Sequence, residues 1–295
     1  MIIVDFNQTA ISTFMAETKG RTDIELNVPL LRHMIVNAIR GYKVKFGAEF
    51  GDIVIACDNR HYWRRKAFPY YKASRKKARE ASGHDWGALF DALHSIRQEL
   101  EEFFPYPVID IDGAEADDVI GALAEYSQGL GESVGLFDDI EAQPLLIISN
   151  DHDFKQLQKF KNVKQYSSMK KGFVKLDCSP EQILIEHIIK GDKGDGVPNI
   201  LSADNSFVDG IRQKPIRKAL LDEWKTKKPV DFVNGDMAHG YNRNSLLVDL
   251  SKTPQEIKDA VINSFEKQQG KTKTDLLNYF IKYRMKNMIE VLEDF

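Results

Sequence analysis

The sequence predicts an α/β fold, in which a mostly parallel β-sheet is flanked by helices and followed by a smaller all-helical domain. Short apolar runs alternate with amphipathic helical segments through the first 180 residues, and the strand pattern stops after them. Parallel neighbours need a long crossover, usually a helix, so this order is typical of a parallel sheet with its functional crevice at the carboxyl ends of the strands. We therefore predict two domains, residues 1–180 and 181–295.

Each predicted strand is a short apolar run bounded by polar or turn residues. Four runs are expected to form the central strands, and two later runs an edge hairpin. In chain order they are Ile2–Phe6, Ile53–Cys57, Val108–Ile111 and Leu145–Ser149, then Val163–Ser167 and Phe173–Leu176.

Between these strands, apolar residues recur at spacings of three and four, which predicts helices with one buried face. The three clearest sets are Leu31, Ile35, Ala38 and Tyr42; Leu89, Leu93, Ile96, Leu100 and Phe103; and Ala116, Val119, Ile120 and Leu123. A last helix, from about Asp275 to Leu292, is expected to pack in the core through Leu277, Ile281, Met285, Met288 and Leu292.

Composition excludes several classes of protein. The chain has 295 residues, 41 Lys and Arg against 44 Asp and Glu, a net charge of -3 and 42% hydrophobic residues. It is therefore neither a disordered acidic protein nor one that coats nucleic acid by bulk charge. Its two cysteines cannot form a disulfide framework or a four-thiolate zinc site. With a strand at the N-terminus and no uncharged run of roughly 18 apolar residues, we expect a soluble cytoplasmic protein without a membrane span.

Acidic residues follow all four central strands. Asp5 and Asp58 close the first two, the third is followed by Glu115, Asp117 and Asp118, and the fourth by Asp151 and Asp153. Single acids at such positions are often helix N-caps. Four in register at one sheet edge would instead repel one another unless a divalent cation compensates them, and Mg²⁺ prefers oxygen ligands. We therefore predict a Mg²⁺ site at this edge, where Mn²⁺ is expected to substitute.

A further pair of acids, Asp192 and Asp195, lies in the segment Lys190–Pro198. Taken alone, this segment is typical of a Gly-rich turn with Asp caps. Beside the strand-end acids it supplies ligands for a second metal ion, and two metal ions roughly 3.5–4 Å apart clamp the attacking and leaving oxygens of a phosphodiester.

Residues 60–79 form a basic, aromatic segment with nine Lys or Arg, five aromatic residues and no acid. A solvated basic helix is the plainer interpretation. The combination of cations for phosphates with rings for unstacked bases favours contact with nucleic acid. The residues expected to make this contact are Tyr62, Arg64, Arg65, Tyr70, Tyr71, Lys72, Arg75, Lys76, Lys77 and Arg79.

In their order along the chain, these motifs resemble the 5′-nuclease superfamily, which includes flap endonucleases and the 5′-nuclease domains of bacterial DNA polymerases. The residues that carry the resemblance are Asp5, Asp58 before the basic segment, Glu115–Asp118, Asp151–Asp153 and Gly191–Asp195, with YWRR at 62–65 and YYK at 70–72. The resemblance spans about residues 1–200. It implies a PIN-like sheet with a helical arch, at about residues 59–86, over the active site.

The resemblance also implies Mg²⁺-dependent 5′–3′ exonuclease and 5′-flap endonuclease activity on DNA and RNA–DNA hybrids, and removal of RNA primers in the phage members. Lys72 and Arg75 would lie over the scissile phosphate, and Tyr71 would stack on a displaced base. The first metal ion would be held by Asp5, Asp58, Glu115, Asp117 and Asp151, and the second by Asp118, Asp153, Asp192 and Asp195.

The chain departs from the family in the helical domain, where residues 199–215 lack the glycines of the usual helix–hairpin–helix. Duplex contact by Arg212, Lys214, Arg217 and Lys218 is then the alternative to ordinary solvated surface. The resemblance further implies a monomer that works with a sliding clamp and a single-strand-binding protein, and residues 289–295 are a candidate clamp-binding tail. A PIN-type endoribonuclease and a non-catalytic junction-binding protein remain the rival interpretations.

Overall fold

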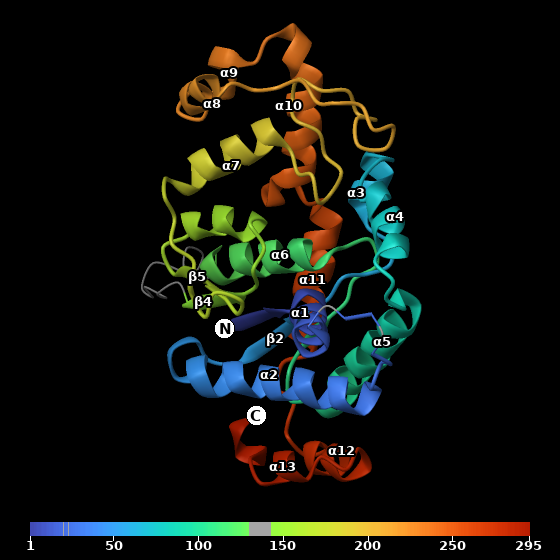
Figure 1. Cartoon of the computed structure of the whole chain (residues 1–295). Coiled ribbons are helices and arrows are strands. Elements are labelled where there is room, and N and C mark those ends of the chain that lie inside the picture. Colours follow the sequence, from blue (N-terminus) through green and yellow to red (C-terminus); the bar gives the residue numbers. More distant parts are fainter. Residues whose placement is uncertain (20, 23, 130–142) are drawn as a thin grey trace, which may run out of the picture.

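The computed structural model describes residues 1–19, 21, 22, 24–129 and 143–295, and its centre is a six-stranded sheet in the order β3-β2-β1-β4-β5-β6 (Figure 1). Strands β1 to β5 are parallel, and β6 pairs antiparallel with β5 at the edge. The predicted sheet and edge hairpin are thus confirmed, although the strands are slightly shorter. Their bounds are Ile2–Asp5, Ile53–Ala56, Val108–Ile109, Leu145–Ile148, Val163–Ser167 and Gly172–Phe173.

The sheet is covered on both faces, because successive side chains of a strand point to opposite sides. Ile2 and Val4 of β1 belong to one core, which α1, α2 and α5 cover, while Ile3 belongs to the other, which α6 covers. The three sets of periodic apolar residues fall in α2, α5 and α6, as predicted. The helices up to this point are α1 (Phe6–Thr18), α2 (Val28–Phe50), α3 (Trp63–Ala67), α4 (Ala73–Ala81), α5 (Trp86–Phe103), α6 (Ala116–Gly129) and the 3-10 helix η1 (Asp153–Lys159).

A separate helical layer stands above the sheet in Figure 1. Its own small core includes Ile189, Ile200, Trp224 and Met237. The layer consists of α7 (Pro180–Lys190), α8 (Lys218–Trp224), α9 (Pro229–Phe232) and α10 (Gly235–Val248). Within it, α10 approaches the loop after α7 so closely that a Cβ on Gly240 would lie 2.3 Å from the carbonyl oxygen of Ile200.

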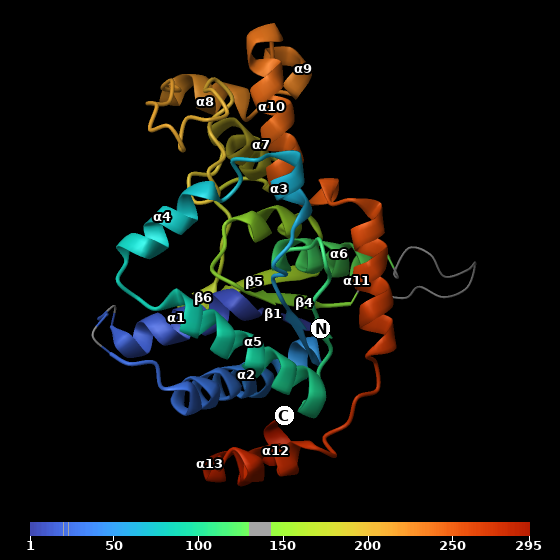
Figure 2. The ribbon, with the colours of Figure 1, turned by 90° about the vertical axis from the view of Figure 1, so that its right-hand side faces the viewer.

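The last 47 residues do not join this layer but return to the sheet. Leu250, Ile257 and Val261 complete the core beneath α6, and Tyr279 and Phe280 complete the core beneath α2 and α5 (Figure 2). The domain predicted at 181–295 is therefore divided in space. Its returning elements are η2 (Leu250–Lys252), α11 (Gln255–Lys267), α12 (Leu276–Lys282), α13 (Lys286–Ile289) and η3 (Leu292–Asp294).

The single helix predicted from about Asp275 to Leu292 is wrong. The chain turns after α12, where Arg284 has a φ of 56° and Met285 N donates to the carbonyl oxygen of Phe280. This turn changes which side faces the core, so that Leu277 and Ile281 are 42% and 58% exposed.

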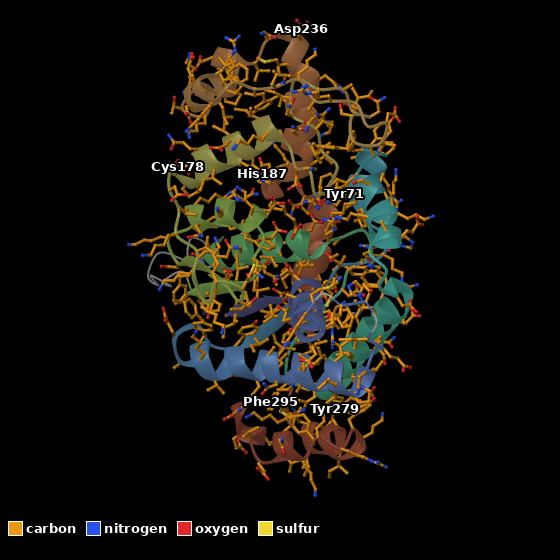
Figure 3. All side chains as sticks on the ribbon, viewed as in Figure 1. Tyr71, Cys178, His187, Asp236, Tyr279 and Phe295 are labelled. Carbon is orange, nitrogen blue, oxygen red and sulfur yellow. The ribbon has the colours of Figure 1, made fainter. Side chains whose placement is uncertain are left out.

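The C-terminal segment is held by polar contacts as well as apolar ones. Tyr279 donates to Glu99 at 2.9 Å, and Glu99 pairs with both Nε and Nη2 of the buried Arg32 at 2.7 and 2.9 Å. Phe295 is buried against Phe104 and Phe280. The free clamp-binding tail predicted at residues 289–295 is therefore not present in this arrangement, and Figure 3 shows Tyr279 and Phe295 together below the sheet.

Of the helices among the described residues, none combines the length and apolarity that crossing a membrane requires.

Candidate active site

The four strand ends bring their acids to one edge of the sheet, as predicted. Asp5 caps α1 by accepting from Gln8 N at 3.1 Å, and its other oxygen accepts from the hydroxyl of Ser149 after β4 at 3.0 Å. Asp58, after β2, accepts from Ala116 N at the start of α6 at 2.9 Å. These bonds link all four strand ends, because β3 leads into α6.

The carboxylates of this edge are close enough to raise one another's pKa. Burial raises the pKa of Asp5 to about 7, and the charges of Asp58 and Asp151 add to the rise. Burial, with the charge of Asp151 next, raises the pKa of Asp117 well above its ordinary value. Burial and the charge of Asp153 raise the pKa of Asp151 to about 6. The edge is therefore an acidic cluster whose negative charge its surroundings do not balance.

A second group of side chains lies beside Asp151 and includes a histidine that was not predicted. The ring of His187 on α7 is 3.0 Å from Asp153 through Nδ1 and 3.3 Å from Asp192 through Nε2. Burial lowers the pKa of His187, but the two carboxylates outweigh it and raise the pKa to about 10. Burial likewise raises the pKa of Asp192, but His187 and two backbone N–H groups lower it to about 2. Figure 3 places His187 between the helical layer and the sheet.

Asp153, His187 and Asp192 offer ligand atoms that all lie within 4.8 Å of one another, which suits a metal ion. The search for histidines at HxxxH spacing missed this group, because only His187 contributes and its partners come from two different segments. The available signal was the position of His187 on the helix that leads into Gly191-Asp192, five residues before that aspartate.

The arch residues Lys72 and Arg75 lie against the acids, as expected. Lys72 Nζ is 2.5 Å from Glu115 and 3.6 Å from Asp195, and Arg75 pairs with Asp195 and donates to the carbonyl oxygen of Gly194 at 3.1 Å. Burial lowers the pKa of Lys72, but Asp195 and Glu115 outweigh it and raise the pKa above its ordinary range. The arch therefore contributes cations directly to the acidic edge.

Asp118 does not belong to this edge. It is fully buried and accepts from Arg64 at 2.8 Å, from Trp63 Nε1 at 3.1 Å and from Thr253 at 2.7 Å. Burial raises its pKa, but Arg64 and the other donors more than offset this and lower the pKa. The expected role of Asp118 as a metal ligand is therefore corrected to a structural one, in which it anchors the arch to α6 and the returning C-terminal segment.

Two arch residues expected to contact nucleic acid are also buried. Arg64 is 1% exposed and donates to Leu247 O, Glu115 and Asp118, while Tyr71 is 2% exposed and donates to Glu115 at 3.1 Å and Asp195 at 2.6 Å. Neither can touch a base or phosphate in this conformation. A sequence of alternating cations and rings does not reveal which of them point inward.

The remaining arch residues border a cavity of about 660 Å³ that lies between the arch and α5 and reaches Asp58 and Glu115. Arg97 of α5 lines its opposite side. Lys77 and Tyr70 are not among the lining residues, and Lys77 is exposed. The cavity is lined from the arch by Tyr62, Arg65, Lys72, Arg75, Lys76 and Arg79. In the helical layer, Arg212, Lys214, Arg217 and Lys218 are all exposed.

This chain belongs to the 5′–3′ exonuclease family, and it is a nuclease. A family model described as "5'-3' exonuclease, N-terminal resolvase-like domain" matches residues 1–184, and one described as "T4 RNase H, C terminal" matches residues 178–295. The chain is 32% identical to the ribonuclease H of Enterobacteria phage T4, over 99% of this chain and 95% of that protein. It is 28% identical to DNA polymerase I of Rhizobium leguminosarum, over 47% of this chain and 12% of that protein.

Solved structures of a bacteriophage T5 nuclease share the fold. The T5 5′-exonuclease with bound zinc has a TM-score of 0.59 and 16% identity, and the match covers 91% of this chain and 99% of that one. A T5 flap endonuclease complex with DNA and metal ions has a TM-score of 0.56 and 17% identity, and the match covers 99% and 98% of the two chains.

Proposed function

We propose that this nuclease is a Mg²⁺-dependent 5′–3′ exonuclease and 5′-flap endonuclease. Its proposed substrates are duplex DNA with 5′ ends or flaps and RNA–DNA hybrids, and its proposed role is removal of RNA primers during phage DNA replication. The observation that carries the proposal is the facing of two opposite charges across one cavity. The acidic edge of the sheet lies on one side, and the basic arch lies over it.

The residues present fit divalent metal ions. Asp5, Asp117 and Asp151 all have raised pKa values, so the fold holds carboxylates together that repel one another when ionised. A hard divalent cation relieves that repulsion and accepts carboxylate oxygens as ligands. Asp5, Asp58, Glu115, Asp117 and Asp151 would hold one ion, and the group around Asp153 and Asp195 a second. When bound, such ions lower the pKa of a coordinated water and stabilise the oxygen that leaves the phosphodiester.

The arch residues would bind and orient the substrate. Arg65, Lys76 and Arg79 line the cavity without an acidic partner among the ion pairs of the described residues, so their charge is available for phosphates. Lys72 and Arg75 lie where the cavity meets the acids, and there they would stabilise negative charge that develops on the phosphate. The expected products carry a 5′-phosphate and a 3′-hydroxyl.

The test compares the wild type with the double variant Asp151→Asn/Asp153→Asn on 5′-labelled flap DNA and an RNA–DNA hybrid, with and without Mg²⁺. We expect products only from the wild type with Mg²⁺, and unchanged DNA binding by the double variant. Asp236→Asn is the matched control, because Asp236 is exposed at the far end of the helical layer (Figure 3). Wild-type cleavage by the double variant would refute the metal assignment.

The same assay decides between the rival interpretations. A preference for structured RNA over both flap and hybrid would indicate a PIN-type endoribonuclease. Binding of the flap without any product in Mg²⁺ or Mn²⁺ would indicate a junction-binding protein.

A further inference from the structure

His187 and Asp153 meet in a way that an ordinary ion pair does not explain. The ring Nδ1 is 3.0 Å from Asp153 Oδ1, yet this oxygen is buried and has no hydrogen-bond partner, because the two groups are not aligned for one. His187 itself is only 9% exposed. Two lone-pair atoms that approach each other this closely without a shared hydrogen bond are typical of neighbouring ligands of one metal ion, since ligand bonds of roughly 2.0–2.1 Å hold adjacent ligands about 3 Å apart.

Asp192 is engaged differently, because both of its oxygens already accept hydrogen bonds. Oδ1 accepts from Asp195 N at 2.9 Å, and Oδ2 lies 3.3 Å from His187 Nε2. A carboxylate that holds the far nitrogen of a histidine fixes the ring's orientation and directs its other nitrogen toward a metal ion. The order Asp192, His187, Asp153 has this form.

We propose that His187 is a direct metal ligand through Nδ1, together with Asp153, and that Asp192 is its positioning residue rather than a ligand. This inference rests on the proposed function, because it assigns the ligands of the second metal position. An imidazole nitrogen in that position favours Mn²⁺, Co²⁺ and Zn²⁺ relative to Mg²⁺, since Mg²⁺ prefers oxygen ligands. The second position would therefore differ in metal preference from the first, whose predicted ligands are all carboxylates.

The experiment uses Mn²⁺ bound to the full-length protein and pulsed electron paramagnetic resonance, which detects a coordinated ¹⁴N nucleus independently of activity. We expect ¹⁴N modulation in the wild type, a change to the ¹⁵N frequency after labelling with ¹⁵N-histidine, and loss of the modulation in His187→Gln. His152→Gln is the matched control, because His152 is exposed and its ring centroid is 5.2 Å from that of His187. Asp192→Asn should keep the modulation while weakening Mn²⁺ binding by roughly 10–100-fold.

The outcomes separate this inference from the proposed function. Mn²⁺ that binds without ¹⁴N modulation, or modulation that His152→Gln rather than His187→Gln removes, would overturn the role of His187 and leave the metal-dependent nuclease in place. Absence of any bound Mn²⁺ would overturn both. The labelled wild type gives the nitrogen assignment even if a variant fails to fold.

Discussion

Replacement of Arg64 by methionine tests whether the basic segment binds the fold or the substrate at that position. The guanidinium is 1% exposed and donates to Asp118 at 2.8 Å, to Glu115 at 3.1 Å and to Leu247 O at 2.8 Å. Methionine keeps the apolar volume of the side chain and removes its charge. The two carboxylates then remain buried without their principal cation.

The expected cost follows from those contacts. Breaking a buried ion pair by removing one partner costs about 3–5 kcal/mol. The lower end applies here, because Lys72 still pairs with Glu115, and Thr253 still donates to Asp118. For 295 residues, an unfolding entropy of about 2.1 cal/mol/K per residue converts about 3 kcal/mol into a fall in Tm of roughly 5 °C.

The matched control is Arg65→Met, one residue along the same helix. Arg65 is exposed and lines the cavity, so its replacement should change stability by no more than about 0.5 kcal/mol while weakening the binding of flap DNA. Both variants would be measured by urea and thermal unfolding and by DNA binding without divalent metal. If Arg64→Met melts like the wild type and weakens DNA binding as much as Arg65→Met does, the structural assignment of Arg64 is refuted.

Three further predictions concern pH, packing and the C-terminal segment. In EDTA, the free energy of unfolding should fall as pH rises from about 5.5 to 7.5, because Asp5 (pKa about 7) and Asp151 (about 6) bind their protons more tightly when folded than at the ordinary value of 3.8; thermal unfolding at the two pH values checks this, and saturating Mg²⁺ should reverse the fall. Gly240→Ala should destabilise by about 1–3 kcal/mol because its Cβ meets the backbone of Ile200, whereas Gly41→Ala in α2, with nothing within 4 Å, should stabilise by about 0.5–1 kcal/mol; urea unfolding showing the same sign for both would contradict this. Tyr279→Phe removes the donor to Glu99 and should cost about 1–3 kcal/mol and increase hydrogen exchange in α12 before α2; uniform exchange through the chain would count against a local role.

The strands and the acidic edge could be predicted because they depend on local periodicity and on a general property of parallel sheets. A run such as Leu145–Ile148 can only be a buried strand or helix, and its length together with the following Asp151 decides for a strand end. All parallel strands deliver their carboxyl ends to one edge, so Asp5, Asp58 and Asp151 meet there without any knowledge of the loops.

The inward-facing residues could not be predicted, because their partners are distant in sequence. Arg64 is buried by Leu247, which is 183 residues away, and His187 owes its place to Asp153 on another element. The break after α12 also lacks the usual signals, since Arg284 rather than glycine takes the left-handed conformation. Such features depend on tertiary packing, and a single sequence gives no periodicity from which to infer them.

The return of the C-terminal segment to the sheet has a consequence for how the protein folds. Tyr279, Phe280 and Phe295 fill the core on the side of β1 that α2 and α5 cover, so a chain still lacking them exposes that apolar surface. Residues 1–184, although they contain every strand, should therefore not form a stable unit during synthesis, and the acidic edge should reach its final geometry only when the last helices dock. The enzyme would then become competent as a whole, after release of the complete chain, rather than domain by domain.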